Sequence, residues 1–352
     1  MRILFACLLF LIGCKFVPYN GNDKYTDKAD LGIDEAPHIR NSLEWWYYTG
    51  HLMDVETGKG YGLEFVFFHF NPRNKKDYIM VNFAITDSSS QKFYFDYKIK
   101  TLTDLLKDDL PINLSYEDKK ESYTLTGQMG EYQLSGKMGD YDISVDLLTK
   151  RQKPAALHSG TGYENYGGYA TAGYYSYPRL SATGSLRIGS HNMNVTGELW
   201  YDRQWNCIGV WQREVAWDWF SVQLDDPKEE LMLYRVYHIG DNATIYGGTY
   251  FKTDGSVVDL ENGDIVLNEL EYWDSKKSKV RYPVKWSLEV KSLSLSMELE
   301  AVLPEQELAL KFSPIHKLYY WEGMCNATGN LKGKAITGNS YIEITNRSVV
   351  NK

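Results

Sequence analysis

Apolar and polar residues alternate with a period of two through most of the chain beyond residue 40, and this pattern constrains the fold more than any other feature. Successive side chains of a β-strand point to opposite faces, so the pattern is typical of strands that bury one face. The clearest runs, rich in aromatic and β-branched residues, are 61–70, 78–87, 91–100, 230–239 and 284–290. Short turn sequences separate them. We therefore predict an all-β chain, in which barrels or sandwiches limit exposed strand edges.

Three segments depart from simple alternation. The stretch 102–110 (LTDLLKDDL) is the best candidate for a short helix. Between Val290 and Leu293 the apolar residues change parity, which predicts a bulge in one long strand or two strands in series. The segment 154–186 is rich in Gly and Tyr. Its glycines predict a loop, and its tyrosines indicate that the loop lies across an interface or a pocket mouth.

The chain repeats one order of motifs. EWWYYTGHL (44–52) precedes YGLEFVFFH (61–69), and WDWFSVQL (217–224) precedes ELMLYRVYH (230–238). Each pair is an aromatic-rich strand followed by an alternating strand that ends in His. This repetition predicts two similar barrel-like domains, 41–206 and 207–352, which also suits a chain longer than one core usually holds. The alternative is that aromatic strands resemble one another without duplication.

The first residues have the layout of an export signal. Arg2 precedes a short apolar run that ends in LIGC at Cys14. This ending resembles the lipobox of bacterial lipoproteins, which predicts removal of residues 1–13, lipidation of Cys14 and a polar lipidated tether over 14–40. We expect an exported lipoprotein of the cell envelope that touches the membrane only through this anchor. An ordinary signal peptide, with Cys14 a spare thiol, is the alternative.

Composition and spacing argue against several functions. The net charge of −8 argues against a nucleic-acid partner. The histidines are dispersed without metal-ligand spacing, and no Gly-x-Ser-x-Gly motif is present, so we expect neither a metal site nor a serine hydrolase, and no cofactor. Cys207 and Cys325 could form a disulfide in an exported protein, but two buried thiols are the simpler interpretation.

Six ordered blocks of sequence resemble one family of secreted proteins. They are EWWYYTGHL, KPAALHSGTGYENYG with GYYSYPRLSATGSL, GELWYDRQW, WDWFSVQL, ELMLYRVY, and YWEG with TGNLKGKAITGNSYIEIT. The family is the AttH-like or hydroxyneurosporene-synthase-like family, whose members include bacterial carotenoid 1,2-hydratase and fungal decalin-forming Diels–Alder cyclases. The resemblance covers about 40–346. It implies two tandem lipocalin-like antiparallel β-barrels and an apolar polyene-like or terpenoid-like ligand in an aromatic-lined pocket.

A hydratase of this kind needs a carboxylic acid of raised pKa in a dry, aromatic site. Asp202 in LWYDRQW is the best candidate, because Trp200 and Trp205 flank it in the sequence. Arg203 follows, where the resembling proteins often have His. An Arg203–Asp202 ion pair would hold the carboxylate ionised. A catalytic acid and a structural ion pair therefore both stay open for Asp202.

The predicted strand that begins at Glu44 turns its side chains to two opposite faces. Glu44 and Trp46 share one strand face and His51 lies on the other, so the acid and the imidazole cannot act together. A lipocalin's first strand commonly carries a Trp that plugs the barrel, so we expect one face in a core and the other against the partner domain. The full set of candidate pocket or interface residues is Trp46, Tyr175, Tyr177, Trp200, Arg203, Trp205, Trp219, Trp321 and Glu322.

Three functions follow as hypotheses. The first is a monomeric exported lipoprotein that binds an apolar isoprenoid, polyene or other lipid and hydrates or isomerises it. The second is a non-catalytic lipid carrier or envelope interaction protein with the same fold. The third is glycan binding through exposed aromatic residues, for which the sequence offers no motif.

Overall fold

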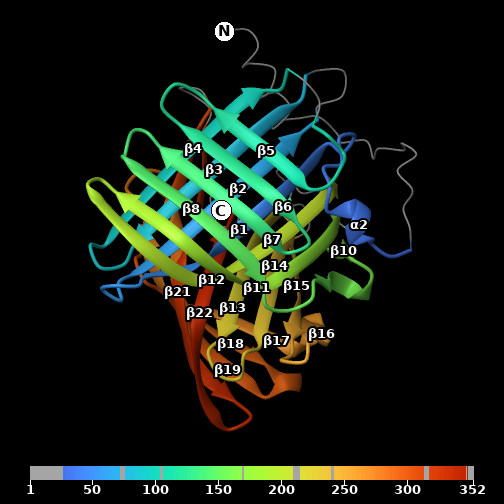
Figure 1. Cartoon of the computed structure of the whole chain (residues 1–352). Helices are drawn as coiled ribbons and strands as arrows, with labels where there is room; N and C mark the ends of the chain where they lie inside the picture. The colour runs from blue at the N-terminus through green and yellow to red at the C-terminus, as the bar shows by residue number, and fades with distance from the viewer. Residues whose placement is uncertain are drawn as a thin grey trace. The chain divides into compact units, whose positions relative to one another are not determined.

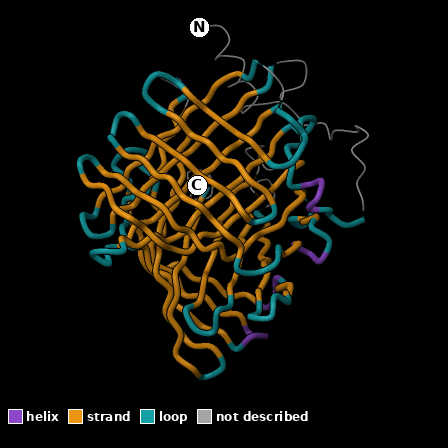
Figure 2. Tube along the Cα trace, in the orientation of Figure 1, coloured by secondary structure: helices purple, strands orange, loops and turns teal. Residues whose placement is uncertain are grey.

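A computed structural model describes residues 27–71, 76–103, 106–168, 170–208, 215–238, 242–312, 317–345 and 347. About two thirds of these residues belong to two antiparallel β-sheets (Figures 1 and 2). The predicted signal peptide and Cys14 lie outside the described residues. Within the described ranges, no helix has both the length and the apolar character needed to cross a bilayer.

The described chain divides into two compact units. One contains residues up to 164 together with 172–207, and we call it the N-terminal barrel. The other contains 165–171 and the residues from 208 onward, and we call it the C-terminal barrel.

The N-terminal barrel is one curled sheet in the order β4-β3-β2-β1-β12-β11-β8-β7-β6-β5, with β9 and β10 paired to β11. Side chains join its two ends: the Tyr123 hydroxyl donates to Asp96 Oδ2 at 3.1 Å, and Lys98 pairs with Glu121 at 2.7 Å. The sheet is thus nearly closed into a barrel. Its strands are β1 (Leu43–Asp54), β2 (Gly60–Phe70), β3 (Tyr78–Asp87), β4 (Lys92–Thr101), β5 (Ile112–Glu117), β6 (Ser122–Gln128), β7 (Glu131–Met138), β8 (Ile143–Arg151), β9 (Ala156–Leu157), β10 (Tyr163–Asn165), β11 (Thr171–Ile188) and β12 (His191–Ile208).

The C-terminal barrel repeats this topology, with the order β16-β15-β14-β13-β22-β21-β19-β18-β17 and β20 paired to β21. In both sheets the first strand lies between the second and the last, so β13 and β14 correspond to β1 and β2. The predicted fold of two lipocalin-like barrels is confirmed. The strands are β13 (Val215–Leu224), β14 (Glu230–His238), β15 (Ala243–Phe251), β16 (Val257–Leu260), β17 (Ile265–Asp274), β18 (Arg281–Val290), β19 (Leu295–Ala301), β20 (Glu307–Lys311), β21 (Lys317–Leu331) and β22 (Lys334–Ile344).

Each barrel encloses its own core because the alternating strands turn their apolar residues inward. In the N-terminal barrel the core combines aromatic residues such as Phe65 and Phe83 with aliphatic residues such as Leu134 and Leu147. In the C-terminal barrel Trp286 and Trp321 lie at the centre, with ring centroids 6.0 Å apart.

Three local predictions differ from the structure. The described residues within 102–110 are not helical. The parity change after Val290 is a short 3₁₀ turn, η3 (Lys291–Leu293), between two antiparallel neighbours, β18 and β19, rather than strands in series. The second half of the Gly/Tyr-rich segment is the long strand β11. Its glycines allow close approach: a Cβ at Gly173 would lie 2.1 Å from the Trp205 ring, and one at Gly184 would lie 1.9 Å from the Asp146 carbonyl oxygen.

Residues 29–41, which we call the N-terminal strap, pack on the N-terminal barrel instead of continuing a tether. They include one helical turn, α2 (Leu31–Asp34), capped by the Asp30 side chain. Glu35 and Ala36 are buried. The predicted tether over 14–40 therefore differs from the structure in its last part, and residues 14–26 lie outside the described ranges.

The cysteine alternatives are resolved in the described residues. Cys207 and Cys325 are both free and buried. Burial raises the pKa of each thiol well above its usual value, so both behave as small apolar side chains.

Candidate functional site

The pairing of β1 with β12 places neighbouring polar residues on opposite faces of one wall. Trp46 lies opposite Arg203, and Tyr47 lies opposite Asp202. Trp46 belongs to the barrel core, so Arg203 also points inward and Asp202 points outward. The ion pair between Asp202 and Arg203, one of the two alternatives for Asp202, is therefore wrong.

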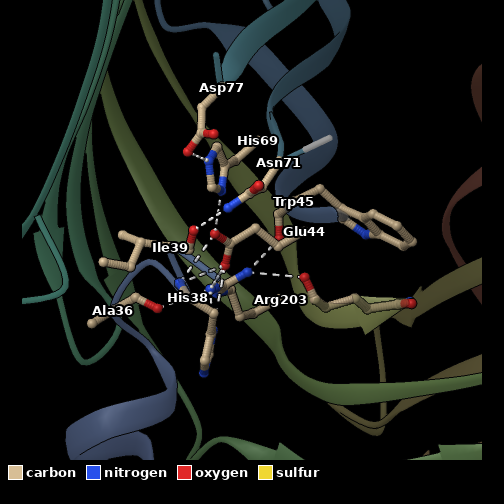
Figure 3. A network of polar contacts seen from close by, with 10 residues as sticks. Ala36, His38, Ile39, Glu44, Trp45, His69, Asn71, Asp77 and Arg203 are labelled. Carbon is tan, nitrogen blue, oxygen red and sulfur yellow. Dashed lines mark hydrogen bonds and ion pairs between the residues drawn. The ribbon is translucent and has the colours of Figure 1, made fainter. Parts of the chain in front are cut away.

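Arg203 is instead the centre of a buried ion cluster at one end of the N-terminal barrel (Figure 3). Its Nη2 donates to Glu44 Oε2 at 2.5 Å and to the Ala36 carbonyl oxygen at 2.9 Å. The His69 ring joins two acids, with Nδ1 2.8 Å from Glu44 Oε1 and Nε2 3.1 Å from Asp77 Oδ2. Glu44 of β1, His69 of β2 and Arg203 of β12 thus form one cluster with the strap.

The cluster holds its groups in their charged forms. Burial alone would raise the pKa of Glu44, but the charge of Arg203 and hydrogen bonds from His38 and His69 hold it well below its usual value. Burial would lower the pKa of His69, but its bonds to Asp77 and Glu44 raise it to about 9. A cluster whose acids are held ionised by neighbouring cations suits a structural role better than proton transfer.

Aromatic rings enclose the same guanidinium. The Arg203 Cζ lies 4.1 Å from the ring centroid of Trp46 and 5.7 Å from that of Trp205. His38 of the strap stacks on Trp205 with centroids 5.1 Å apart. Trp46, Arg203 and Trp205, predicted as pocket or interface residues, thus close one end of the barrel together with the strap.

A layer of five tyrosines lies next to the barrel end that Trp46, Arg203 and Trp205 close. We call Tyr48, Tyr132, Tyr175, Tyr177 and Tyr201 the tyrosine layer, and all five belong to the barrel core. Tyr201 is central, with its ring centroid 4.6 Å from that of Tyr48 and 5.2 Å from that of Tyr132. The two predicted residues Tyr175 and Tyr177 therefore line the barrel interior.

The hydroxyl groups of this layer are poorly satisfied. Among the described residues, the hydroxyls of Tyr48, Tyr175, Tyr177 and Tyr201 have no partner with hydrogen-bond geometry, although the nearby Arg151 partly offsets the raised pKa of Tyr177. Tyr175 and Tyr201 influence each other's ionisation without the geometry of a hydrogen bond. A buried polar group without a partner costs about 1–3 kcal/mol, so the layer favours any acceptor that reaches it, including ordered water.

The outward face carries a different group, which we call the Asp202 cluster. Asp202 Oδ1 accepts from the Ser176 hydroxyl at 2.5 Å and from Trp200 Nε1 at 2.6 Å. Its Oδ2 accepts from the Tyr174 hydroxyl at 2.6 Å. Trp200 and Tyr174 are buried but lie outside the barrel core. Alternate residues of β11 and β12 therefore converge on one carboxyl group.

Among the described residues, only neutral groups donate hydrogen bonds to Asp202. Burial raises its pKa, and the three hydrogen bonds from Ser176, Tyr174 and Trp200 lower it only in part, so that it stays at about 6. Both protonation states are thus populated near neutral pH, as general acid–base catalysis requires. Oδ1 already accepts two hydrogen bonds, whereas Oδ2 accepts one, so Oδ2 is the atom best placed to carry the exchangeable proton.

A buried histidine extends this cluster. His158 Nε2 lies 2.8 Å from Ser176 Oγ, and the His158 ring packs on Tyr174 with centroids 3.9 Å apart. Burial lowers the pKa of His158 to about 3, so the ring is neutral. When the Ser176 hydroxyl donates to an ionised Asp202, its oxygen accepts from His158 in the Nε2–H tautomer. His158 thereby orients Ser176.

The predicted site residues fall into three groups rather than one pocket. Asp202 and Trp200 belong to the Asp202 cluster, and Trp46, Tyr175, Tyr177, Arg203 and Trp205 belong to the barrel interior. Trp219, Trp321 and Glu322 lie in the C-terminal barrel. There Trp321 is a core residue whose Nε1 donates to the Pro304 carbonyl oxygen at 2.7 Å, while Trp219 and Glu322 are buried outside the core cluster.

Sequence reasoning missed three members of the Asp202 cluster. Tyr174 and Ser176 lie two apart on β11, as Trp200 and Asp202 do on β12. This matching period-two spacing was a usable signal. His158, in the turn after β9, offers no such spacing. Within the described ranges, no group of three or more His, Cys, Asp or Glu side chains is placed to hold a metal ion.

Solved structures share this two-barrel fold. A protein of Nitrosomonas europaea provisionally named AttH matches with a TM-score of 0.76 and 23% identity, over 91% of this chain and 97% of that one. Kievitone hydratase from Nectria haematococca matches with a TM-score of 0.71 and 14% identity, over 95% and 98%. CghA with Sch210972 matches with a TM-score of 0.59 and 11% identity, over 95% and 97%. At these identities the likeness concerns the fold.

Sequence comparison is decisive for the family but not for the activity. A search of curated proteins finds no match. The AttH-like family model matches residues 24–347, which is nearly the whole chain. The chain therefore belongs to the AttH-like family.

Proposed function

We propose that this protein is an exported, membrane-anchored lipoprotein that binds an apolar isoprenoid, polyene or other lipid and hydrates or isomerises one of its double bonds. Asp202 is the acid and base of this reaction. One observation carries the proposal: a fully buried carboxyl group with a pKa of about 6 is bonded by three neutral donors and by no cation among the described residues.

In the hydration, the protonated Asp202 donates its Oδ2 proton to one alkene carbon, and the other carbon becomes a carbocation. The π faces of Trp200 and Tyr174 are suited to stabilise this positive charge. A water molecule then forms the new C–O bond and returns one proton to the Asp202 carboxylate, so the enzyme ends in its starting state. In the isomerisation, the carboxylate instead removes a proton from a carbon next to the cation.

Two further lines support the proposal. The shared fold includes a structure named as a hydratase, kievitone hydratase, which makes water addition a reasonable expectation for this architecture. Export and lipidation rest on the LIGC sequence at Cys14. A carrier that binds the lipid without changing it is the alternative, and one experiment separates the two.

The test uses the mature chain without its first 14 residues, so that no lipid anchor is present. The protein is incubated with a total lipid extract of its own host, and the bound and free lipids are analysed by mass spectrometry. We expect a retained polyene or terpenoid and a product that is heavier by one water, or an isomer of equal mass with a new retention time.

Two variants make the test specific. Asp202→Asn should retain the lipid and lose turnover, since the amide keeps the shape but cannot donate the proton. Asp146→Asn, an exposed change on β8, should behave as wild type. Unchanged lipid with both wild type and variant would support the carrier, and no retained lipid would overturn both hypotheses.

A further inference from the structure

A carboxylate from the N-terminal strap reaches into the closed end of the N-terminal barrel. Glu35 is fully buried, and both of its oxygens lie 2.8 Å from the backbone nitrogen of Met129. The Tyr132 hydroxyl also donates to Oε1. The barrel therefore provides a site for a carboxyl group on a short, unbranched stem, and its donors come from β7 and the turn that precedes it.

The site has more donors than Glu35 uses. In the part of the chain that the structure describes, four buried hydroxyls of the tyrosine layer and the buried Trp46 Nε1 have no partner with hydrogen-bond geometry. These hydroxyls lie within electrostatic reach of the carboxyl group, because, after burial itself, the charge of Glu35 contributes to the raised pKa of Tyr48, Tyr175, Tyr177 and Tyr201. A donor-rich aromatic cage is suited to a carboxylate with oxygens free to accept.

Glu35 belongs to the strap rather than to the barrel wall. The single turn of α2 is too short to be stable alone, so contacts with the barrel hold the strap in place. These contacts do not belong to a strand ladder: the Ala29 nitrogen donates to the Thr161 carbonyl oxygen, Arg203 to the Ala36 carbonyl oxygen and Asn71 to the Ile39 carbonyl oxygen, while His38 joins the ion cluster and stacks on Trp205. A competing carboxylate can therefore replace Glu35 without unfolding a strand.

We propose that the closed end of the N-terminal barrel is a carboxylate-binding site, which Glu35 occupies internally and which accepts a carboxylic acid on an unbranched alkyl stem when the strap is displaced. Tyr132 and the Met129 backbone nitrogen hold the incoming group as they hold Glu35. The site lies on the inner face of the wall, and Asp202 lies on the outer face, so this inference does not rest on the proposed function.

The test removes the Glu35 carboxylate, which occupies the site, from the mature chain. Binding of propionate and of oleate, each ¹³C-labelled at the carboxyl carbon, is measured by NMR for wild type and for Glu35→Ala. Because wild type must first displace Glu35, we expect Glu35→Ala to bind propionate at least tenfold more tightly. Ile33→Ala, a change at an exposed side chain of the same strap, should bind as wild type. Tyr132→Phe added to Glu35→Ala should weaken binding about tenfold.

Further ligands define the chemistry. Propionamide and methyl oleate should bind poorly, since neither carries a carboxylate. Tighter binding of oleate than of propionate would indicate a fatty acid as the natural ligand, and equal binding would indicate a short acid; both support the site. The proposal is overturned if Glu35→Ala binds propionate no better than wild type, or if propionamide binds equally well.

A second variant covers the case in which Glu35→Ala does not fold. Glu35→Gln keeps the shape of the side chain but replaces one carboxyl oxygen with an NH₂ group. This NH₂ group faces hydrogen-bond donors, so the Gln side chain binds the site more weakly than Glu35 does. Its affinity for propionate should exceed that of wild type, and no increase would also overturn the proposal. Neither result bears on Asp202, whose titration should be the same in both variants.

Discussion

Glu44 and Asp202 lie on opposite faces of one β-wall, and both are fully buried, yet their pKa values move in opposite directions. Glu44 contacts the cations Arg203 and His69, whereas the described partners of Asp202 are all neutral donors. Burial alone therefore does not decide the protonation state of a carboxyl group here; the charge of its neighbours does. The inner cluster is fixed in its charged form, and the outer one is free to exchange a proton.

The C-terminal barrel supports this interpretation. Its first strand also carries a buried acid, Asp218, which accepts from Arg235 Nε at 2.8 Å and Arg347 Nη2 at 3.0 Å. Glu269 joins the same two arginines, and after the opposing effect of burial their charges lower its pKa. Each barrel thus contains a buried ion cluster, and in the described part of the chain only the N-terminal cluster includes imidazoles. We therefore expect only that cluster to lose a charge as the pH rises through about 9, where His69 titrates.

The largest expected effect comes from breaking the inner cluster. Arg203→Met leaves Glu44 buried without its main counter-charge, so we expect a loss of about 3–5 kcal/mol in the free energy of unfolding. Denaturant titration measures it. Arg187→Met removes an exposed pair with Asp142 and should cost less than about 1 kcal/mol. Equal losses in the two variants would show that the inner cluster is not a structural plug.

The next effect is the pH dependence of the same cluster. The pKa of His69 is raised from 6.5 to about 9, so its contribution is complete below pH 6.5 and is lost as the pH rises through 9. The loss is about 3 kcal/mol at most, at 1.36 kcal/mol per pKa unit. Unfolding of wild type and His69→Gln at pH 6 and pH 9.5 checks it. A wild-type curve as flat as that of the variant would contradict the assignment.

On the outer face the stability also falls as the pH rises, but it does so at a lower pH. The pKa of Asp202 is raised above its usual 3.8, so its neutral form favours the fold below that value, and this contribution is lost as the pH rises through about 6. Asp202→Asn should therefore stabilise the protein by up to about 3 kcal/mol at pH 8 and have little effect at pH 4. Thermal unfolding at both pH values measures this difference. Destabilisation at pH 8 would mean that Asp202 serves the fold.

The smallest effect concerns the neighbours of Asp202. Ser176→Ala removes a donor to the charged carboxylate and should raise the pKa of Asp202 by about one unit. His158→Phe, which removes only the group that orients Ser176, should shift it less. The pH profile of turnover reports both shifts. An unchanged profile in Ser176→Ala would remove Ser176 from the site.

Much of the fold could be predicted from the sequence, because the period of two and the turn residues act locally. The repeated Trp-rich and alternating strands also indicated two similar domains. Strand β11 could not be predicted as a strand, because the sequence alone suggests that its glycines form a loop. In the structure these glycines allow close contact with residues that are distant in the sequence: Gly173 leaves space for the Trp205 ring, and Gly184 leaves space for the neighbouring backbone. The folding of the strap likewise depends on barrel residues distant in the sequence, such as Tyr132 and Arg203.

The candidate site was predicted only in part. Aromatic neighbours correctly marked Asp202 as a buried acid. Adjacency in the sequence wrongly suggested Arg203 as its partner, because neighbours on a strand point to opposite faces. The true partner of Arg203, Glu44, is 159 residues away. Such a pairing depends on strand register, which no local pattern shows.

A site-specific titration of the Asp202 carboxyl group tests the central claim most directly. The ¹³C carboxyl resonance of Asp202, assigned by its absence in Asp202→Asn, is followed from pH 3 to pH 9 in the ligand-free protein. The resonance of Glu44, assigned with Glu44→Gln, provides the internal comparison. We predict that Asp202 titrates with a midpoint near 6, while Glu44 titrates well below the usual range of a glutamate. A midpoint for Asp202 below 4 would contradict the account, because the carboxyl group would then be permanently ionised and could not act as the acid.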